Sequence, residues 1–300
     1  MDFLTEIKWE KAWELIKGFF DSNFFTAFFG ASIGALGAGY ISKKQKQKDD
    51  LLNEIRSTNK AIVAVFGICN PLLGMKKQHI KPLKEDFDAS RRRLDHFMEQ
   101  RKKEIIPISA RFDFKANFET YHLPDVPIAN LLTLMFEKLS VAGKALHLGT
   151  TLNQTLQTLR QILKTREEFI VQHKNPRHPI AAELYFGLPT AVGTDNTYPS
   201  CVEAIYNLTD DSLYFAISLS EELVTHGNEL ATTYKKLFKE EAPTVHQQDF
   251  SDPECQALLP DPKLYEDWQK MYRKKPNQSL NWWKRMRAWS KKKFVRFIDG

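Results

Sequence analysis

The residue types that most often act in catalysis or metal binding are present, but their spacing matches no catalytic arrangement. The eight histidines are scattered, and the closest two, His173 and His178, are expected to be ordinary surface side chains near a loop. The sequence contains no phosphate-binding loop, no dinucleotide-binding glycine pattern, no zinc-hydrolase motif and no serine-hydrolase motif. We therefore expect no catalytic residue, no cofactor and no metal ion, and the interpretation leans away from an enzyme.

Two pairs of neighbouring acids are better explained by structure than by acid–base chemistry. The pair Asp210–Asp211 fits the start of a helix, capped by Thr209 or Asp210, and the pair Glu221–Glu222 fits a solvated helix face. The segment Tyr185–Cys201 contains two glycines and two prolines, so it is predicted to be a long loop. This loop is the best place for a small-ligand site, and an enzyme with an unrecognised site there stays an open alternative.

The cysteines indicate a reducing compartment rather than a stapled fold. Cys69, Cys201 and Cys255 are widely spaced and odd in number. They form no CxxC pair and no cysteine–histidine box, so neither a disulfide framework nor a structural zinc site is indicated. With 42% apolar and 27% charged residues among 300, the chain can form one large or two small domains with a core, and a disordered chain is excluded.

An uncharged segment near the N-terminus is the clearest element of the sequence. No charged residue lies between Asp21 and Lys43. As a helix, the 19 residues from Phe24 to Ser42 would measure roughly 28 Å, close to the ~30 Å hydrocarbon core of a bilayer. We predict a transmembrane helix over residues 23–42. The alternative is a buried helix of a soluble core, which is disfavoured because helices that are apolar on every face are rare in a chain of this size.

Small residues recur every four positions within this predicted transmembrane helix. One ladder joins Gly30, Gly34 and Ala38, and a second joins Ala27, Ala31, Ala35 and Gly39. Small residues at this spacing let two helix backbones approach closely, which is how membrane helices associate. The helix is therefore expected to form a homo-oligomer, although glycine and alanine are also common in membrane helices for reasons of composition alone.

Basic residues are distributed unevenly around the predicted transmembrane helix. Three lysines precede it, whereas six basic residues follow within about 18 positions, beginning with the KKQKQK run at residues 43–48. The positive-inside rule then places the N-terminal tail outside and the C-terminal domain in the cytosol, as in a single-pass inner-membrane protein. Residues 1–22 are predicted to form an amphipathic helix in the outer interface, with Trp9 and Trp13 among the headgroups.

The body is predicted to be a mainly α-helical cytosolic bundle over residues 43–240. Helices are expected over residues 50–70, 82–103 and 128–139, then over a leucine-rich stretch ending at His173, and finally along a seam from Leu213 to Leu237. Pro71 and Gly74 are expected to end the first of these helices. Ser220 and Gly227 on the last seam indicate close approach of a neighbouring helix.

Residues 105–121 are the one convincing β element. From Ile106 to Thr120 the even positions are apolar until the final threonine, and the odd positions after Pro107 are polar or charged, which is the period-two pattern of a strand with one buried face. A strand of this length would measure about 50 Å, so a bend or a hairpin near residues 115–117 is expected. No comparable segment is present to pair with it, and an unpaired strand invites a partner chain.

The C-terminal end is predicted to be a second membrane contact. Residues 241–262 contain four prolines and are interpreted as a linker to residues 263–300, which carry a basic, tryptophan-rich amphipathic helix. The expected membrane-surface residues, which place an aromatic face opposite a basic one, are Trp282, Trp283, Lys284, Arg285, Met286, Trp289, Lys292, Phe294, Arg296 and Phe297. Such a helix suits an anionic inner leaflet, and its three tryptophans favour lipid over single-stranded nucleic acid.

Together these features predict a membrane-anchored, non-enzymatic helical protein that acts as a scaffold, a sensor or a partner-recruiting module at the inner membrane surface. The alternative is an oligomerising transmembrane effector, of the toxin-like or phage-defence type, that perturbs the membrane when its cytosolic domain is triggered. The expected partners are an anionic lipid bilayer, further copies of the chain and a protein partner.

Overall fold

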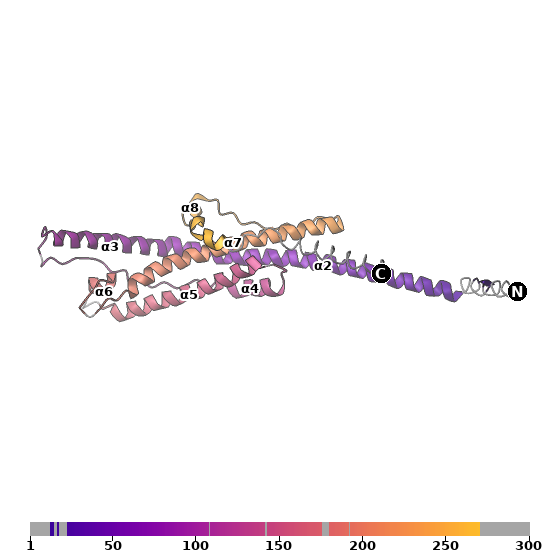
Figure 1. The fold of residues 1–300 in the computed structure, drawn as a ribbon, viewed down its shortest axis with the longest axis horizontal. Helices are drawn as coiled ribbons and strands as arrows, with labels where there is room; N and C mark the ends of the chain where they lie inside the picture. The colour runs from indigo at the N-terminus through magenta and orange to yellow at the C-terminus, as the bar shows by residue number, and fades with distance from the viewer. Residues whose placement is uncertain are drawn as a thin grey trace, which may run out of the picture.

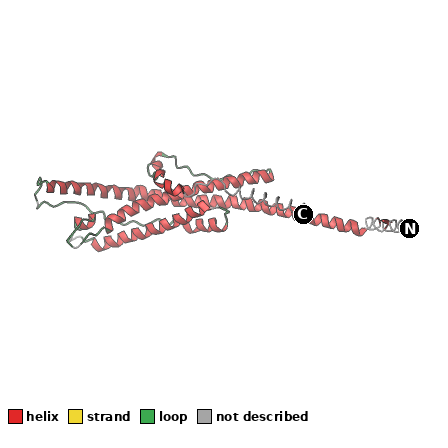
Figure 2. Cartoon of the chain, in the orientation of Figure 1, coloured by secondary structure: helices red, strands yellow, loops and turns green. Residues whose placement is uncertain are grey.

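The computed structural model describes most of the chain as helix. The described residues are 23–270, apart from Ile108, Ala142, 176–179 and Val192, together with the helical residues Trp13, Glu14 and Lys17; within the first long helix, side chains are described from Gly37 onward. No β-strand occurs among these residues (Figure 2). They form an elongated helical bundle from which one end of the longest helix projects (Figure 1). The predicted mainly helical fold is confirmed for this part of the chain.

Helix α2 spans Asn23–Met75 and forms the axis of the molecule. Its 53 residues correspond to about 80 Å at the usual rise. The predicted transmembrane helix and the first helix of the body are therefore one continuous helix. Within the bundle, α2 buries a stripe of side chains at spacings of three and four, among them Ile55, Ile62, Val65 and Leu72.

The prediction that Pro71 and Gly74 end this helix is wrong. Pro71 lies inside α2, and the chain continues through one π-helical turn, Lys76–Ile80, into α3, Lys81–Lys102. Pro82 occupies the start of α3, directly after the wider π turn, where a missing N–H is tolerated best. The buried side chains on either side of Pro71 explain the continuity, because packing on the bundle outweighs the loss of a single backbone hydrogen bond.

Helix α7, Thr197–Phe238, runs antiparallel to α2 and shares its most extensive interfaces with α2 and with α5, Gly143–His173. Because α7 begins at Thr197, two predictions are wrong. Thr209 and Asp210 lie in the middle of α7 rather than at its cap, and the predicted loop Tyr185–Cys201 includes the end of α6, Ala182–Phe186, and the first turn of α7. The true loop is shorter because helical packing extends α7 toward its N-terminus.

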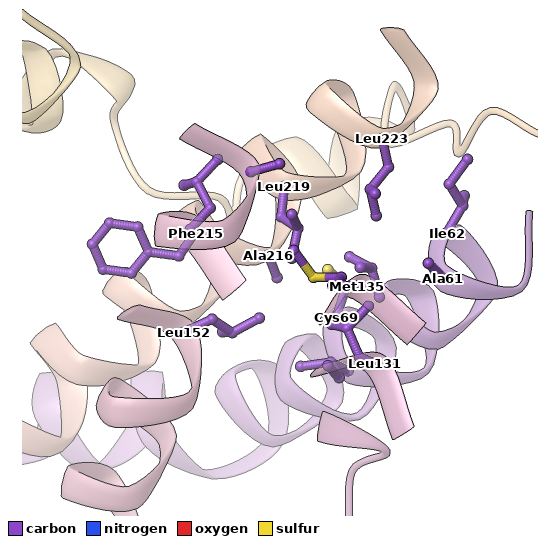
Figure 3. Packing of buried hydrophobic residues seen from close by; sticks show 14 of the residues in the cluster. Ala61, Ile62, Cys69, Leu131, Met135, Leu152, Phe215, Ala216, Leu219 and Leu223 are labelled. Atoms are coloured by element: carbon purple, nitrogen blue, oxygen red, sulfur yellow. The ribbon is translucent and has the colours of Figure 1, made fainter. Parts of the chain in front are cut away.

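The main core lies where α2, α7, α5 and the short helix α4, Ile128–Glu137, meet (Figure 3). Figure 3 shows Cys69 of α2 facing Met135 and Leu131 of α4, with Ala216 and Leu219 of α7 above them. The leucine-rich seam of α5 is buried, as predicted, at Leu152, Leu156, Leu159, Leu163 and Ile170. These contacts bury one face of α2 within the bundle.

The predicted β element is not a strand. Residues 109–121, here named the strap, follow α3 and run back along the bundle without regular secondary structure or a β-ladder among the described residues. The period-two pattern nevertheless predicts orientation correctly: side chains at even positions from Ala110 to Phe118 are partly buried, whereas those at odd positions from Ser109 to Lys115 are exposed. The apolar–polar alternation predicts which side chains face the core, but it does not predict a strand, because strand pairing also requires a second extended segment.

The segment 241–262, interpreted as a linker, lies against α2 and α7. The Asn59 side chain donates to the carbonyl of Thr244 at 2.8 Å, and Gln248 donates to the carbonyl of Ile62 at 2.6 Å. Three short helices follow along this part of the chain: α8, Pro253–Gln256; a 3-10 turn, η2, Pro262–Tyr265; and α9, Glu266–Lys270. The predicted amphipathic C-terminal helix and most of the N-terminal tail lie outside the described residues.

Candidate functional site

The projecting end of α2 is the first candidate region. We name residues 23–50 of this helix the outer segment. Every described side chain from Gly37 to Gln47 is exposed, including Tyr40 and Ile41, which are 69% and 68% exposed. A Cβ atom built on Gly37 or Gly39 would meet no described atom within 4 Å beyond the neighbouring backbone of its own helix. Within the described chain this helix surface therefore has no packing partner.

Of the predicted association residues, only Ala38 and Gly39 have described side chains, and both are exposed. The remaining ladder positions lie on the helical backbone of the outer segment: Ala27, Gly30, Ala31, Gly34 and Ala35. Along Gly37–Lys102, an 18-residue window with at most two charged residues reaches a mean hydropathy of 1.2, and 44% of it is buried. The lysines and aspartates of residues 43–50 exclude the outer segment from this window, which therefore lies in the part of the helix that packs in the bundle. By length and composition, this helix is long and apolar enough to cross a membrane.

A group of lysines marks the boundary between the outer segment and the bundle. Lys48 of α2 pairs with Glu240, just after the end of α7, at 2.7 Å. This contact places the tip of α7 beside Lys48, at the end of the KKQKQK run, so the last turn of α7 with Lys235, Lys236 and Lys239 lies near the end of that run. We name these residues the lysine collar: Lys43, Lys44, Lys46, Lys48, Lys235, Lys236 and Lys239.

The collar is an exposed cationic surface. Only Lys48 and Lys235 have a carboxylate within ion-pair distance among the described residues. The side-chain hydrogen bond with Glu240, the largest cause, raises the pKa of Lys48. Leu237, which is 46% exposed, adds an apolar side chain at the tip of α7.

The strap at the other end of the bundle is the second candidate region. Phe112 and Phe114 lie with stacked rings, 5.9 Å between centroids, and Phe114 contacts Tyr185 and Phe186 of α6 at 5.2 and 5.0 Å. These rings belong to a separate aromatic core formed by α3, α5, α6 and the start of α7. The strap is therefore held by its even-numbered side chains against the bundle.

A buried arginine fixes the far end of the strap. Arg166 of α5 is 1% exposed. Its guanidinium donates to the carbonyl of Glu119 at 2.6 Å and to that of Asn117 at 3.1 Å, and it lies about 5 Å from the ring centroids of Tyr121 and Tyr198. Nε of Arg166 has no hydrogen-bond partner among the described residues. Planar donors and aromatic faces together compensate the buried charge in place of a carboxylate.

Sequence reasoning missed Arg166, although a signal was present. The buried leucine seam of α5 has Leu163 and Ile170 seven residues apart, and Arg166 occupies the intervening core position. A charged residue at a core position is rare unless its hydrogen bonds are satisfied. It therefore indicates a specific polar contact inside the bundle.

A cavity of about 1180 Å³ lies beside the strap. Its walls include apolar side chains from the end of α3, from the strap and from the segment near α6: Leu94, Phe97, Met98, Phe112, Phe114, Ile180 and Leu188. Its polar lining includes Arg101, Arg111 and Lys174 as cations and Asp113 and Glu183 as anions. His173 also lines it, and its Nδ1 lies 2.8 Å from the Phe169 carbonyl. A smaller cavity of about 460 Å³ borders the loop after α6, within the segment that the sequence indicates as the best place for a small-ligand site.

The remaining polar clusters are structural. Glu54 accepts hydrogen bonds from the backbone and hydroxyl of Ser140 and lies 3.1 Å from Nε2 of His226. Serine and histidine both contact the carboxylate rather than each other, so no nucleophile–base pair is formed. Desolvation opposes ionisation, but the bonds from Ser140 and His226 lower the pKa of Glu54 overall.

The acid pair in α7 joins separate parts of the bundle. Asp210 pairs with the buried Lys76 of the π turn, and Lys76 also donates to the carbonyl of Leu258 at 2.7 Å. Asp211 accepts a hydrogen bond from the hydroxyl of Tyr265 at 2.8 Å. No group of three or more potential metal ligands occurs among the described residues. The acid pair thus fastens the segment after α7 to the bundle instead of capping a helix.

The other predicted membrane contact, Trp282 to Phe297, lies outside the described residues. Comparison of the chain with protein-family models, with curated proteins and with solved structures found no match.

Proposed function

We propose that this chain is a membrane-anchored, non-enzymatic helical protein that acts as a scaffold, a sensor or a partner-recruiting module at the inner membrane surface. The observation that carries the proposal is the exposure of residues 37–42 at the described end of the uncharged run, where Tyr40 and Ile41 have no packing partner in the described chain. Exposed apolar side chains in water are unfavourable, whereas a bilayer would cover them. The lysine collar begins at Lys43, directly after the uncharged run, as expected for the cytosolic side of a membrane helix.

The level of the collar supports the same proposal. The tip of α7 lies beside Lys48, six residues beyond Ser42 and hence about 9 Å along the helix. The headgroup layer of a bilayer is several ångströms thick on each side. The collar would therefore lie at the anionic surface, where each basic residue contributes about 1 kcal/mol of attraction.

Membrane extraction tests the proposal. The full-length protein is expected to stay with membranes in sodium carbonate, and Ile33→Lys with Leu36→Lys is expected to release it, because a lysine at the centre of a membrane helix costs about 3 kcal/mol. The matched control places the same two charges on exposed bundle positions, Gln157→Lys and Gln161→Lys. Release of the unaltered protein by carbonate would contradict the membrane anchor.

A second candidate function is an oligomerising effector that perturbs the membrane. It is favoured by the open surface at Gly39, where one small-residue ladder ends, and by the continuity of α2, which would transmit a change in the bundle directly to the outer segment. Cell growth on expression distinguishes the two functions. Toxicity that disappears with Gly34→Leu, while membrane localisation is kept, would favour the effector.

A further inference from the structure

We propose that the strap is a docking edge for an extended peptide of a partner protein, which adds to it as a second β-strand and places alternate side chains in the adjoining cavity. The proposal specifies the recruiting surface of the proposed function, but it does not depend on the membrane anchor. It rests on the backbone of the strap, on the cavity beside it and on the charges around both.

The strap backbone has no regular secondary structure and is unpaired among the described residues, and the alternating burial of its side chains is that of extended chain. No N–H or C=O from Arg111 to Ala116 forms a hydrogen bond with another described residue. Backbone polar groups normally find a partner in the protein or in water, and a row of them along extended chain is a template for another strand. The strap is already held in the required conformation, because its even-numbered side chains pack on the aromatic core.

The contacts of Arg166 identify which backbone edge is available. In extended chain, the N–H and C=O of one residue point to the same edge, and those of the next residue point to the opposite edge. Asn117 and Glu119 direct their carbonyls to Arg166, and the N–H of Asn117 donates to the hydroxyl of Tyr185 at 3.1 Å. The odd-numbered edge therefore faces the bundle there. The edge open to a partner is formed by Phe112, Phe114 and Ala116.

The cavity and the surrounding charges define the chemistry of the peptide. The cavity of about 1180 Å³ is lined by strap residues on one side and by α3 and the segment near α6 on the other. Apolar side chains at alternate positions of a peptide would enter it. The exposed positions of the strap carry Arg111, Asp113 and Lys115, and the charged residues elsewhere in the cavity wall are Arg101, Lys174 and Glu183. This excess of positive charge favours a peptide that alternates apolar and acidic residues.

A lipid-like anion is the competing occupant for an apolar cavity with basic residues. An acyl chain would fill the cavity but would leave the strap backbone unpaired, since it carries no amide groups. A peptide satisfies both the cavity and the backbone. The unpaired edge therefore favours the peptide.

The test uses the full-length protein in detergent micelles and an acetylated, amidated peptide of alternating valine and glutamate. Binding is followed by fluorescence anisotropy, and amide hydrogen exchange is measured along the strap. We expect protection at Phe112, Phe114 and Ala116 and none at Arg111, Asp113 and Lys115. Methylating the amide nitrogens on one edge of the peptide should abolish binding, whereas methylating the other edge should leave it unchanged.

Proline variants of the strap provide the matched pair. Ala116→Pro removes an N–H from the open edge and should weaken binding about tenfold, the effect of one lost backbone hydrogen bond. Lys115→Pro removes an N–H from the opposite edge and should leave binding within twofold.

Peptide binding without alternating protection, or binding insensitive to methylation of either edge, would overturn the proposal. Protection by sodium laurate but not by the peptide would also overturn it and assign the cavity to an acyl anion. Carbonate extraction of the same protein reports separately on the membrane anchor.

Discussion

The two parts of α2 are both rich in apolar residues, yet they meet different surroundings. From Ile55 onward, apolar side chains are buried on one stripe and polar side chains such as Asn59 and Lys60 interrupt them. Before Lys43 no charge interrupts the apolar run, and the described side chains are exposed. The pattern, rather than apolar content, therefore distinguishes a helix that packs on protein from one that needs another environment.

The largest expected effect comes from truncating one isoleucine in each part of α2. Ile62 is 1% exposed and Ile41 is 68% exposed. Ile62→Ala is expected to lower the free energy of unfolding by about 2–5 kcal/mol through the cavity it leaves, whereas Ile41→Ala should change it by less than about 0.5 kcal/mol. Chemical denaturation of the full-length protein in detergent measures both. Equal losses would show that the outer segment packs on the bundle.

Removing a cation is also expected to cost stability in the bundle but not in the outer segment of α2. Arg166→Met removes donors from the carbonyls of Asn117 and Glu119 and is expected to cost about 2–3 kcal/mol, because charged hydrogen bonds in a buried site are lost. Lys46→Met, a cation of the outer segment without an ion pair among the described residues, is expected to cost nothing measurable. Hydrogen exchange should accelerate at residues 117–119 in the Arg166 variant alone. Unchanged exchange there would mean that the arginine does not hold the strap.

Replacing a glycine by alanine is expected to change the stability less, and in opposite directions in the two regions. A Cβ on Gly227 of α7 would lie 2.9 Å from Val245, so Gly227→Ala is expected to destabilise the protein by about 1–2 kcal/mol. Gly37→Ala in the outer segment meets no atom and should stabilise the helix by about 0.5–1 kcal/mol. Thermal unfolding compares the two variants. Val245→Ala should restore the Gly227 variant, and failure of this rescue would locate the clash elsewhere.

The smallest effect concerns pH. Because hydrogen bonds hold the pKa of Glu54 below its usual 4.5 in the folded protein, its contribution to stability is present above that value and is lost as the pH falls below about 4.5 toward the lower folded-state pKa. Glu54→Gln should therefore reduce the loss of stability over this acidic range. Melting temperatures measured between pH 6 and pH 3 give the comparison. If the melting temperatures of the two proteins fall in parallel as the pH is lowered, Glu54 does not contribute to the pH dependence of stability.

The sequence predicts helices well because their apolar periodicity is local. The helices near residues 82–103 and 128–139 and the buried leucines of α5 are confirmed. Pro71 misleads because a proline weakens a helix locally, whereas the side chains packed around it act across the bundle. The start of α7 is misplaced for a similar reason, since the buried Tyr198 and Val202 extend the helix beyond its apparent cap.

The candidate sites are predictable only in part. The lysines of residues 43–48 are visible in the sequence, but the lysines of α7 join them only because the antiparallel bundle brings Glu240 to Lys48. The alternation of residues 110–118 predicts which side chains face the core, yet it cannot specify the absence of a pairing strand. Both outcomes depend on contacts between residues far apart in the chain.

The most direct test of the central claim is the environment along α2 in a lipid nanodisc. Spin labels would be placed singly at positions 37–60 of a variant in which the three native cysteines are replaced by serine or alanine. We expect labels at positions 37–42 to be accessible to oxygen and protected from a water-soluble nickel complex, with the reverse at exposed positions beyond Lys43. Equal accessibility of positions 37–42 and 43–50 to the nickel complex would contradict the claim that residues 23–42 of the outer segment enter the bilayer.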